Sequence, residues 1–160
     1  MNKPTDERPN VIPWPPMVYV AAILVALALG FAVPLAWLPP GPLTDILFML
    51  GILMIAGGIA LDLYAISVLH RHKTTVMPNR AVSHIVTSGP YALSRNPIYL
   101  GETVLMIGTG LFSGNVWFIV LAFIASFAVQ KLAIEREEKH LEHKFQKAWR
   151  DYAKRVKRWI

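Results

Sequence analysis

Residues 17–37 read MVYVAAILVALALGFAVPLAW, and none of these side chains is charged. A helix needs about 20 apolar residues to cross the ~30 Å hydrocarbon core of a bilayer. Tyr19 and Trp37 lie near the ends of the stretch, where amphipathic aromatic side chains favour the membrane interface. The stretch therefore predicts a membrane-spanning helix, and the sequence PPGP at residues 39–42 predicts a sharp break after it.

Charged residues are segregated along the whole chain. Only 16% of the 160 residues are charged and 54% are hydrophobic, whereas a typical soluble domain has ~25% charged residues. Asp45 and Asp62 are the only charged residues between positions 17 and 69, and Glu102 is the only one between positions 98 and 130. A surface helix of a soluble domain instead carries charges on its hydrated face. We therefore predict a single integral membrane domain over residues 1–160.

The remaining apolar segments complete an all-α membrane protein with about four transmembrane helices and a C-terminal amphipathic cytoplasmic helix. A second helix is expected at residues 43–69, so that residues 17–69 hold the first two crossings. Asn96-Pro97 predicts an N-cap and a first-turn proline for a helix that reaches Phe112. A turn at residues 113–115 and a return helix to about Lys131 follow. Each arm is short, which indicates a tilted hairpin. Residues 133–160 predict one amphipathic helix.

Basic residues predict the orientation. Residues 70–96 hold Arg71, Lys73, Arg80 and Arg95, and residues 131–160 hold many more, whereas the loops at 38–44 and 113–115 hold none. By the positive-inside rule, both termini and the middle segment face the cytoplasm of what we expect to be a bacterial inner membrane. No small-residue cleavage site follows the N-terminal tail, residues 1–16, and we expect the first apolar run to be retained as a helix. The net charge of +6 then indicates contact with anionic membrane lipids rather than with nucleic acid.

No metal site is predicted. The chain has no cysteine, which excludes disulfides, thiolate nucleophiles and cysteine-ligated metals. The histidines form no H-E-x-x-H motif. His140 and His143 lie three residues apart on a charged segment, where a solvated helix face is the simpler explanation than a metal pair.

The middle segment combines turn-forming, hydroxyl and basic residues directly before a buried helix. Gly89-Pro90-Tyr91 and Arg95-Asn96-Pro97 are its main features. A helix N-terminus offers unpaired N–H groups and the positive end of the helix dipole. Together with Arg95, it would suit an anionic group such as a carboxylate. The simpler alternative is that Gly89-Pro90 is only a turn and that Arg95 is an interfacial anchor.

Several motifs follow one another over residues 61–160 with a characteristic order and spacing. They are Thr74-Thr75-Val76 with Pro78, Ile85-Val86-Thr87, Gly89-Pro90-Tyr91, Arg95-Asn96-Pro97 with Tyr99 and Gly101, Glu135-Arg136-Glu137-Glu138 with Leu141 and Phe145, and Tyr152, Val156 and Arg158-Trp159-Ile160. The set resembles the isoprenylcysteine carboxyl methyltransferase family, most closely its short bacterial branch. The resemblance implies a methyltransferase core over residues 70–160, with S-adenosylmethionine bound in a cytoplasm-facing pocket.

The resemblance also implies the cofactor-binding residues. They are Val86, Gly89, Pro90, Tyr91, Arg95, Asn96, Pro97, Tyr99, Glu137 and Glu138. Arg95 is also a catalytic candidate, because it could orient a carboxylate acceptor instead of the cofactor's own carboxylate. The alternative to cofactor binding is that Glu137 and Glu138 simply lie on the solvated face of a helix.

Other positions are expected to matter less or depart from the family. Glu102 is a second catalytic candidate and Asp62 a weaker one, because intramembrane carboxylates are functional hypotheses by default. Asn96 stands where the eukaryotic relatives have histidine and cannot titrate, which puts proton transfer there in doubt. Gln146 replaces the family's usual glycine, a deviation expected to be minor within a helix. Trp149 and Trp159 are expected to be interface anchors.

Together these features predict transfer of a methyl group from S-adenosylmethionine to an amphiphile, with a carboxylate, amine or thiol acceptor, that enters from the bilayer. Two alternatives stay open: an NADPH-dependent membrane reductase of the sterol-reductase type and a non-enzymatic four-helix membrane protein. The short chain and the Glu137-Glu138 pair favour the methyl donor over NADPH. Clustering of charge in one loop and tail disfavours the non-enzymatic protein. The glycine-rich second helix would permit a homodimer.

Overall fold

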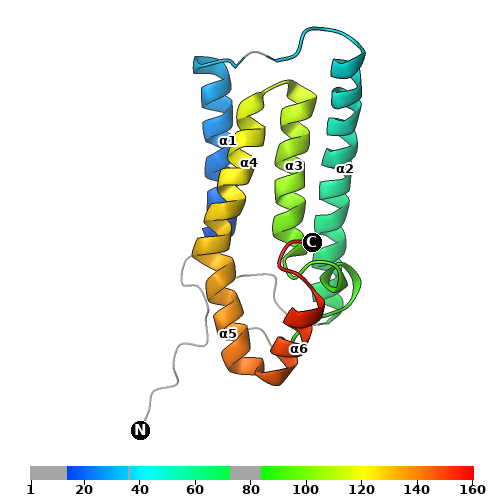
Figure 1. The fold of residues 1–160 in the computed structure, drawn as a ribbon, viewed down its shortest axis with the longest axis vertical. Helices are drawn as coiled ribbons and strands as arrows, with labels where there is room; N and C mark the ends of the chain where they lie inside the picture. Colours follow the sequence, from blue (N-terminus) through cyan, green and yellow to red (C-terminus); the bar gives the residue numbers. More distant parts are fainter. Residues whose placement is uncertain (1–13, 36, 73–83) are drawn as a thin grey trace.

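A computed structural model describes residues 14–35, 37–72 and 84–160, and every element within these ranges is helical (Figure 1). The motif at Thr74–Pro78 and the basic residues Lys73 and Arg80 lie outside the described residues. The elements are α1 (Trp14–Ala32), α2 (Pro42–Arg71), the 3-10 helix η1 (Gly89–Ala92), α3 (Pro97–Ser113), α4 (Val116–Val129), the π-helical segment η2 (Gln130–Ile134), α5 (Glu135–Phe145) and α6 (Lys147–Arg155).

Four long helices lie side by side in the order α1, α4, α3, α2 (Figure 1). Within the described residues, three segments are long and apolar enough to cross a membrane, namely Pro15–Ala32, Pro42–Arg71 and Val116–Phe145. Helix α3 has 17 residues, and among the four helices of the row only α4, with 14, is shorter. The predicted all-helical membrane fold is confirmed, and a fourth crossing by α3 is not established.

Prolines set the ends of the first two helices. Helix α1 ends at Ala32, five positions before the predicted end at Trp37. Pro34 explains the difference, because the residue before a proline is disfavoured in helical conformation. Helix α2 begins at Pro42, where the missing N–H of proline costs no helical hydrogen bond.

Glycines allow α2 and α3 to pack at close range. A Cβ atom at Gly51 would lie 2.8 Å from the carbonyl oxygen of Gly108, and one at Gly58 would lie 2.9 Å from that of Gly101. Small residues at such crossings permit backbone contact between membrane helices. Two of the glycines that suggested a homodimer are therefore used within the chain. Gly57 faces open space.

The expected short return helix is wrong, because α4 does not stop near Lys131. It continues through η2 into α5, so that residues 116–145 form one 30-residue helical run. The turn before it is as predicted: Gly114 is left-handed with φ 66°, and Asn115 accepts a hydrogen bond from the Trp117 N–H over 3.1 Å. The sequence VQKLAI at residues 129–134 contains no glycine or proline, so nothing ends the helix there.

The single C-terminal helix predicted for residues 133–160 is also wrong, because the chain reverses at Gln146. This residue has φ 45° and ψ −111° and is the one non-glycine residue with positive φ in the described ranges. Helix α6 then folds back, with Trp149, Tyr152 and Val156 buried together. The glycine-to-glutamine difference thus lies in a strained turn and not within a helix.

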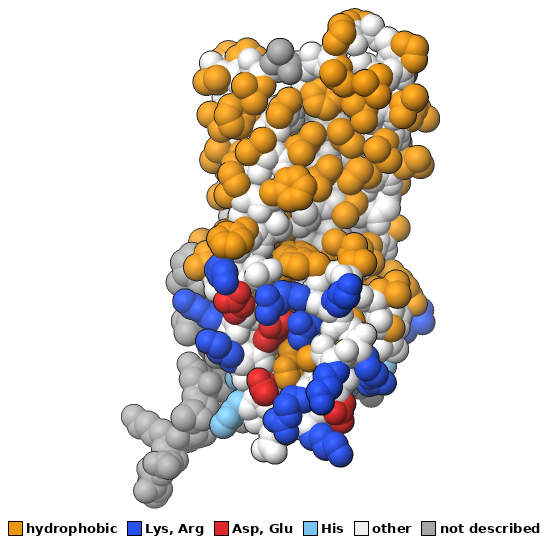
Figure 2. Space-filling model, viewed as in Figure 1, with side chains coloured by type: hydrophobic (Ala, Val, Ile, Leu, Met, Phe, Trp, Pro, Cys, Tyr) orange, Lys and Arg blue, Asp and Glu red, His pale blue; other side chains and the backbone are white. Residues whose placement is uncertain are grey.

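Charged side chains gather at one end of the molecule. Figure 2 shows a hydrophobic surface over the helical row and Lys, Arg, Asp and Glu side chains over α5, α6 and the C-terminal segment. The C-terminus returns to the start of α3 (Figure 1). This polar end brings the loop before α3, helix α5 and the C-terminal segment together.

Candidate functional site

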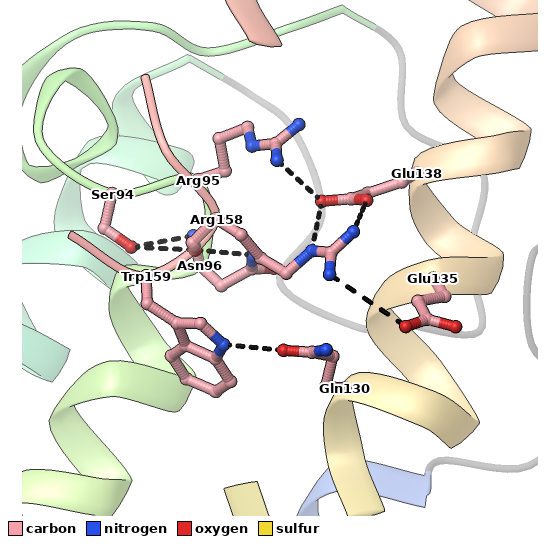
Figure 3. Close-up of polar contacts among 8 residues, drawn as sticks. All are labelled: Ser94, Arg95, Asn96, Gln130, Glu135, Glu138, Arg158 and Trp159. Carbon is pink, nitrogen blue, oxygen red and sulfur yellow. Dashed lines mark hydrogen bonds and ion pairs between the residues drawn. The ribbon is translucent and has the colours of Figure 1, made fainter. Parts of the chain in front are cut away.

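The C-terminal segment docks on the loop that precedes α3. The Arg95 N–H donates to the carbonyl oxygen of Lys157 over 3.0 Å. The Asn96 side-chain amide and the Ser94 hydroxyl donate to the Arg158 carbonyl oxygen over 3.0 and 3.3 Å, respectively (Figure 3). Asn96 occupies the predicted N-cap position of α3, but its side chain makes no cap hydrogen bond. Its amide fixes the C-terminal segment instead.

The docked segment completes a charged triad with Glu138 at its centre (Figure 3). Arg158 binds Glu138 through two hydrogen bonds, Nε to Oε1 over 3.0 Å and Nη2 to Oε2 over 2.7 Å. Arg95 Nη2 lies 3.2 Å from the same Oε1. The Arg95 and Glu138 side chains are only 14% and 16% exposed. A two-point arginine–carboxylate contact is strong and directional, and these hydrogen bonds raise the pKa of Arg158.

Arg95 retains unused hydrogen-bonding capacity. Its Nε is buried and has no hydrogen-bond partner among the described residues. Its guanidinium carbon lies 5.5 Å from the centre of the Trp149 ring, a cation–π distance. A cavity of about 510 Å³ opens beside Arg95, Glu138, Trp149 and Arg158. Buried polar groups are nearly always satisfied, so the site has both the space and a donor for a ligand's anionic group.

Both tryptophans pack against the protein, and the buried Trp149 is not the expected interface anchor. Trp149 is 6% exposed and packs edge-on against Tyr152 at a ring separation of 5.7 Å. The Trp159 indole N–H donates to Gln130 Oε1 over 2.9 Å, and its ring packs against the main core (Figure 3). Both rings therefore fix the C-terminal segment against α5 and the helical row.

A second pair joins α3 to α5. The Tyr99 hydroxyl donates to Glu137 Oε1 over 3.3 Å. Four predicted residues are thus brought together in two pairs, Arg95 with Glu138 and Tyr99 with Glu137. Since Glu137 and Glu138 are consecutive, the two pairs lie at the same level of α5.

The Gly89-Pro90-Tyr91 segment forms η1 and supports the site. Gly89 has φ 60°, a conformation that glycine adopts without strain. The Tyr152 hydroxyl donates to the Tyr91 carbonyl oxygen over 2.7 Å. Burial raises the pKa of Tyr152 to about 12, so this hydroxyl remains a donor at physiological pH. Cofactor contact by this segment remains a prediction.

Val86 precedes η1 in the sequence and Pro97 follows it, and both residues are buried. Val86 packs with Val68 and Leu69 of α2, and Pro97 opens α3 with its side chain fully buried. The surroundings of Val86 are apolar. A cofactor contact at either residue also remains a prediction.

Two carboxylates lie deeper, between α2 and α3. The Asp62 carboxylate rests against Gly101, where any side chain would displace it. Within the described residues, Asp62 Oδ1 and Glu102 Oε2 are buried without a hydrogen-bond partner. Arg95 pairs with Glu138, and the catalytic role predicted for Glu102 remains a prediction.

Three contributors were not selected as site residues from the sequence: Arg158, Tyr152 and Tyr19. Arg158 and Tyr152 stand inside the motifs quoted for the C-terminal region, but periodicity alone could not pair them with Glu138 or Tyr91. Tyr19 is 4% exposed on α1, and its hydroxyl reaches the Tyr99 carbonyl oxygen over 3.0 Å. From the sequence, Tyr19 was expected at the membrane interface. No local signal distinguished that position from a buried contact with α3.

Comparison with known proteins identifies the class of protein that carries this arrangement. A family model described as phospholipid methyltransferase matches residues 46–148, which is more than half of the chain. The chain belongs to the phospholipid methyltransferase family. The resemblance to integral membrane methyltransferases is thereby confirmed.

One curated relative covers a larger part of the chain. The nickel-cobalt-cadmium resistance protein NccN of Alcaligenes xylosoxydans xylosoxydans is 29% identical over 140 residues. The match includes 87% of this chain but 59% of that protein, so the chain spans little more than half of its relative's length. No solved structure matches the chain.

Proposed function

We propose that the protein transfers a methyl group from S-adenosylmethionine to an amphiphile held in the bilayer, on a carboxylate, amine or thiol of that amphiphile. The observation that supports this most strongly is the set of charges at the polar end: Arg95 and Arg158 surround Glu138, with Glu137 next to it. Members of the family generally use S-adenosylmethionine. We propose that the active site faces the cytoplasm of a bacterial inner membrane.

The residues present fit such a donor. Its methionine portion carries a carboxylate and an ammonium group, which two arginines and two glutamates can match. Arg95 has a buried Nε without a partner among the described residues, and the cavity beside it measures about 510 Å³, within the usual range of ligand pockets. Arg95 and Arg158 would hold the carboxylate, and Glu137 and Glu138 the ammonium or ribose hydroxyls. S-adenosylmethionine, when bound, supplies an electrophilic methyl group on a sulfonium.

The protein's own contribution is positioning and the exclusion of water. Holding two reactants in line can lower a barrier by ~7–11 kcal/mol, and a dry site strengthens its electrostatic contacts. The docked segment at Arg158 and Trp159 covers the start of α3 and supports both effects. A carboxylate or thiolate acceptor needs no general base. An amine acceptor must release a proton, and Glu102 is the candidate to receive it.

The acceptor is proposed to reach the site laterally from the membrane. The family description names phospholipids, which favours a lipid headgroup among the possible acceptors. NccN is described as a metal-resistance protein, whereas the family description supports an organic acceptor.

Incubation of the purified protein with methyl-labelled S-adenosylmethionine and native membrane extract tests this proposal. We expect label in a chloroform-soluble product, and mass spectrometry of that product identifies the acceptor. If the purified protein instead oxidised NADPH in the presence of the same extract and incorporated no methyl group, the result would support the reductase. Neither reaction, in a preparation that remains folded, would favour the non-enzymatic membrane protein.

A further inference from the structure

We infer that α1 belongs to the catalytic unit and that its Tyr19 is a positioning residue, which acts through Tyr99 on Glu137. The inference rests on the proposed function. The family match begins at residue 46 and leaves all of α1 (Trp14–Ala32) outside it. The family therefore assigns no role to this helix.

Tyr19 is bound at the first turn of α3. Its hydroxyl lies 3.0 Å from the Tyr99 carbonyl oxygen and 2.7 Å from the Thr103 hydroxyl. The Thr103 hydroxyl is itself 2.7 Å from the Tyr99 carbonyl oxygen. The two hydroxyls supply two protons for these three contacts. One hydroxyl therefore donates to the other while the second donates to the carbonyl, so that both are satisfied in a buried position.

Tyr99 lies between α1 and α5. The hydroxyls of Tyr19 and Thr103 both lie within 3.0 Å of its carbonyl oxygen, and its own hydroxyl donates to Glu137 Oε1 over 3.3 Å. Loss of the Tyr19 hydroxyl would remove the polar contact that ties this turn of α3 to α1, and a buried hydrogen bond contributes about 1 kcal/mol. The Tyr99 ring would then be held less closely against Glu137.

The core explains why α1 can serve as a fixed support for this contact. Tyr19, Ala22 and Ala26 are buried on α1 and pack with Phe118 and Ala122 of α4. Helix α4 continues into α5, which carries Glu137. Helix α1 is thus packed against one wall of the site and hydrogen-bonded to the other, and it sets the distance between Tyr99 and Glu137.

The test is the affinity for S-adenosylmethionine of Tyr19→Phe, Thr103→Val and the control Thr109→Val, measured with labelled donor on full-length protein in detergent. Thr109 is a matched control because its hydroxyl also donates to a carbonyl four residues earlier in α3, that of Leu105, over 2.9 Å. We expect Tyr19→Phe and Thr103→Val each to raise Kd about threefold to tenfold. Thr109→Val should change it less than about twofold. Thermal unfolding checks that each variant is folded.

A double-variant cycle separates positioning from general stability. If Tyr19 acts through Glu137, Tyr19→Phe should add less than about twofold to the Kd of Glu137→Gln. Equal effects in both backgrounds, or a Tyr19→Phe protein that binds like Thr109→Val, would overturn the inference and leave the proposed function intact. A wild-type protein that binds no S-adenosylmethionine would overturn the proposed function and this inference with it.

Discussion

Glu138 is held between two arginines that come from separate parts of the chain, Arg95 before α3 and Arg158 in the C-terminal segment. Removing one partner of a buried ion pair leaves the other charge uncompensated, which costs more than the pair's net contribution. We expect Glu138→Ala and Arg95→Ala each to weaken binding of S-adenosylmethionine or turnover by about tenfold or more.

The control for Glu138→Ala is Asp151→Ala, measured in the same labelled-donor assay. Asp151 is an exposed acidic residue of α6 and does not line the cavity beside Arg95. Exposed charges of this kind contribute little. If Asp151→Ala weakened binding as much as Glu138→Ala, the specific role of the charged triad would be wrong.

Gln146 is the strained residue of the described chain, with φ 45° and ψ −111°. A glycine would adopt this conformation without the clash that a Cβ atom causes. We expect Gln146→Gly to increase the free energy of unfolding by about 1 kcal/mol. Thermal unfolding in detergent measures it, with Gln146→Ala as the control because alanine retains the Cβ. Equal stability of the glycine and alanine variants would show that the turn is not strained.

At the scale of helices, the glycines of α2 distinguish a buried contact from an open face. A Cβ atom at Gly58 would approach the Gly101 carbonyl oxygen to 2.9 Å, whereas one at the adjacent Gly57 meets nothing within 4 Å. We expect Gly58→Ala to lower the free energy of unfolding by about 1–3 kcal/mol. Gly57→Ala should be neutral or stabilising, because alanine is the better helix former. Destabilisation by Gly57→Ala but not by Gly58→Ala would contradict the packing of α2 on α3.

Helix positions could be predicted from the sequence because apolar length and proline punctuation are local signals. The start of α3 at Asn96-Pro97 and the turn at Gly114 were of this kind. Two features depend on the fold and could not be predicted in this way. Helix α4 continues past the charged residue Lys131, where a change in composition suggested a boundary. The reversal at Gln146 carries a residue that ordinarily favours a helix.

The site shows the same division between local and long-range information. Local motifs nominated Arg95 and Glu138, which the structure brings to within 3.2 Å of each other. Asn96 takes the predicted N-cap position of α3, but its amide binds the Arg158 carbonyl oxygen, contributed by a segment far away in the sequence. Hydropathy and spacing contain no information on such tertiary partners.

At the scale of the whole molecule, the charge distribution predicts a cytoplasmic site and a hairpin tip on the opposite side of the membrane. The chain has no cysteine, so single substitutions report orientation without background. In bacterial spheroplasts, which lack an intact outer membrane but keep the inner one, we expect an impermeant thiol reagent to label Ser113→Cys. It should label Lys144→Cys only after permeabilisation. The reverse pattern would invert the proposed orientation.

Calorimetric titration of the detergent-purified wild-type protein with S-adenosylmethionine, and separately with NADPH, tests the central claim most directly. The charged triad and the cavity beside Arg95 predict saturable binding of S-adenosylmethionine and none of NADPH. Binding of NADPH alone, or of neither compound by a folded protein, would contradict the proposed methyl-donor site.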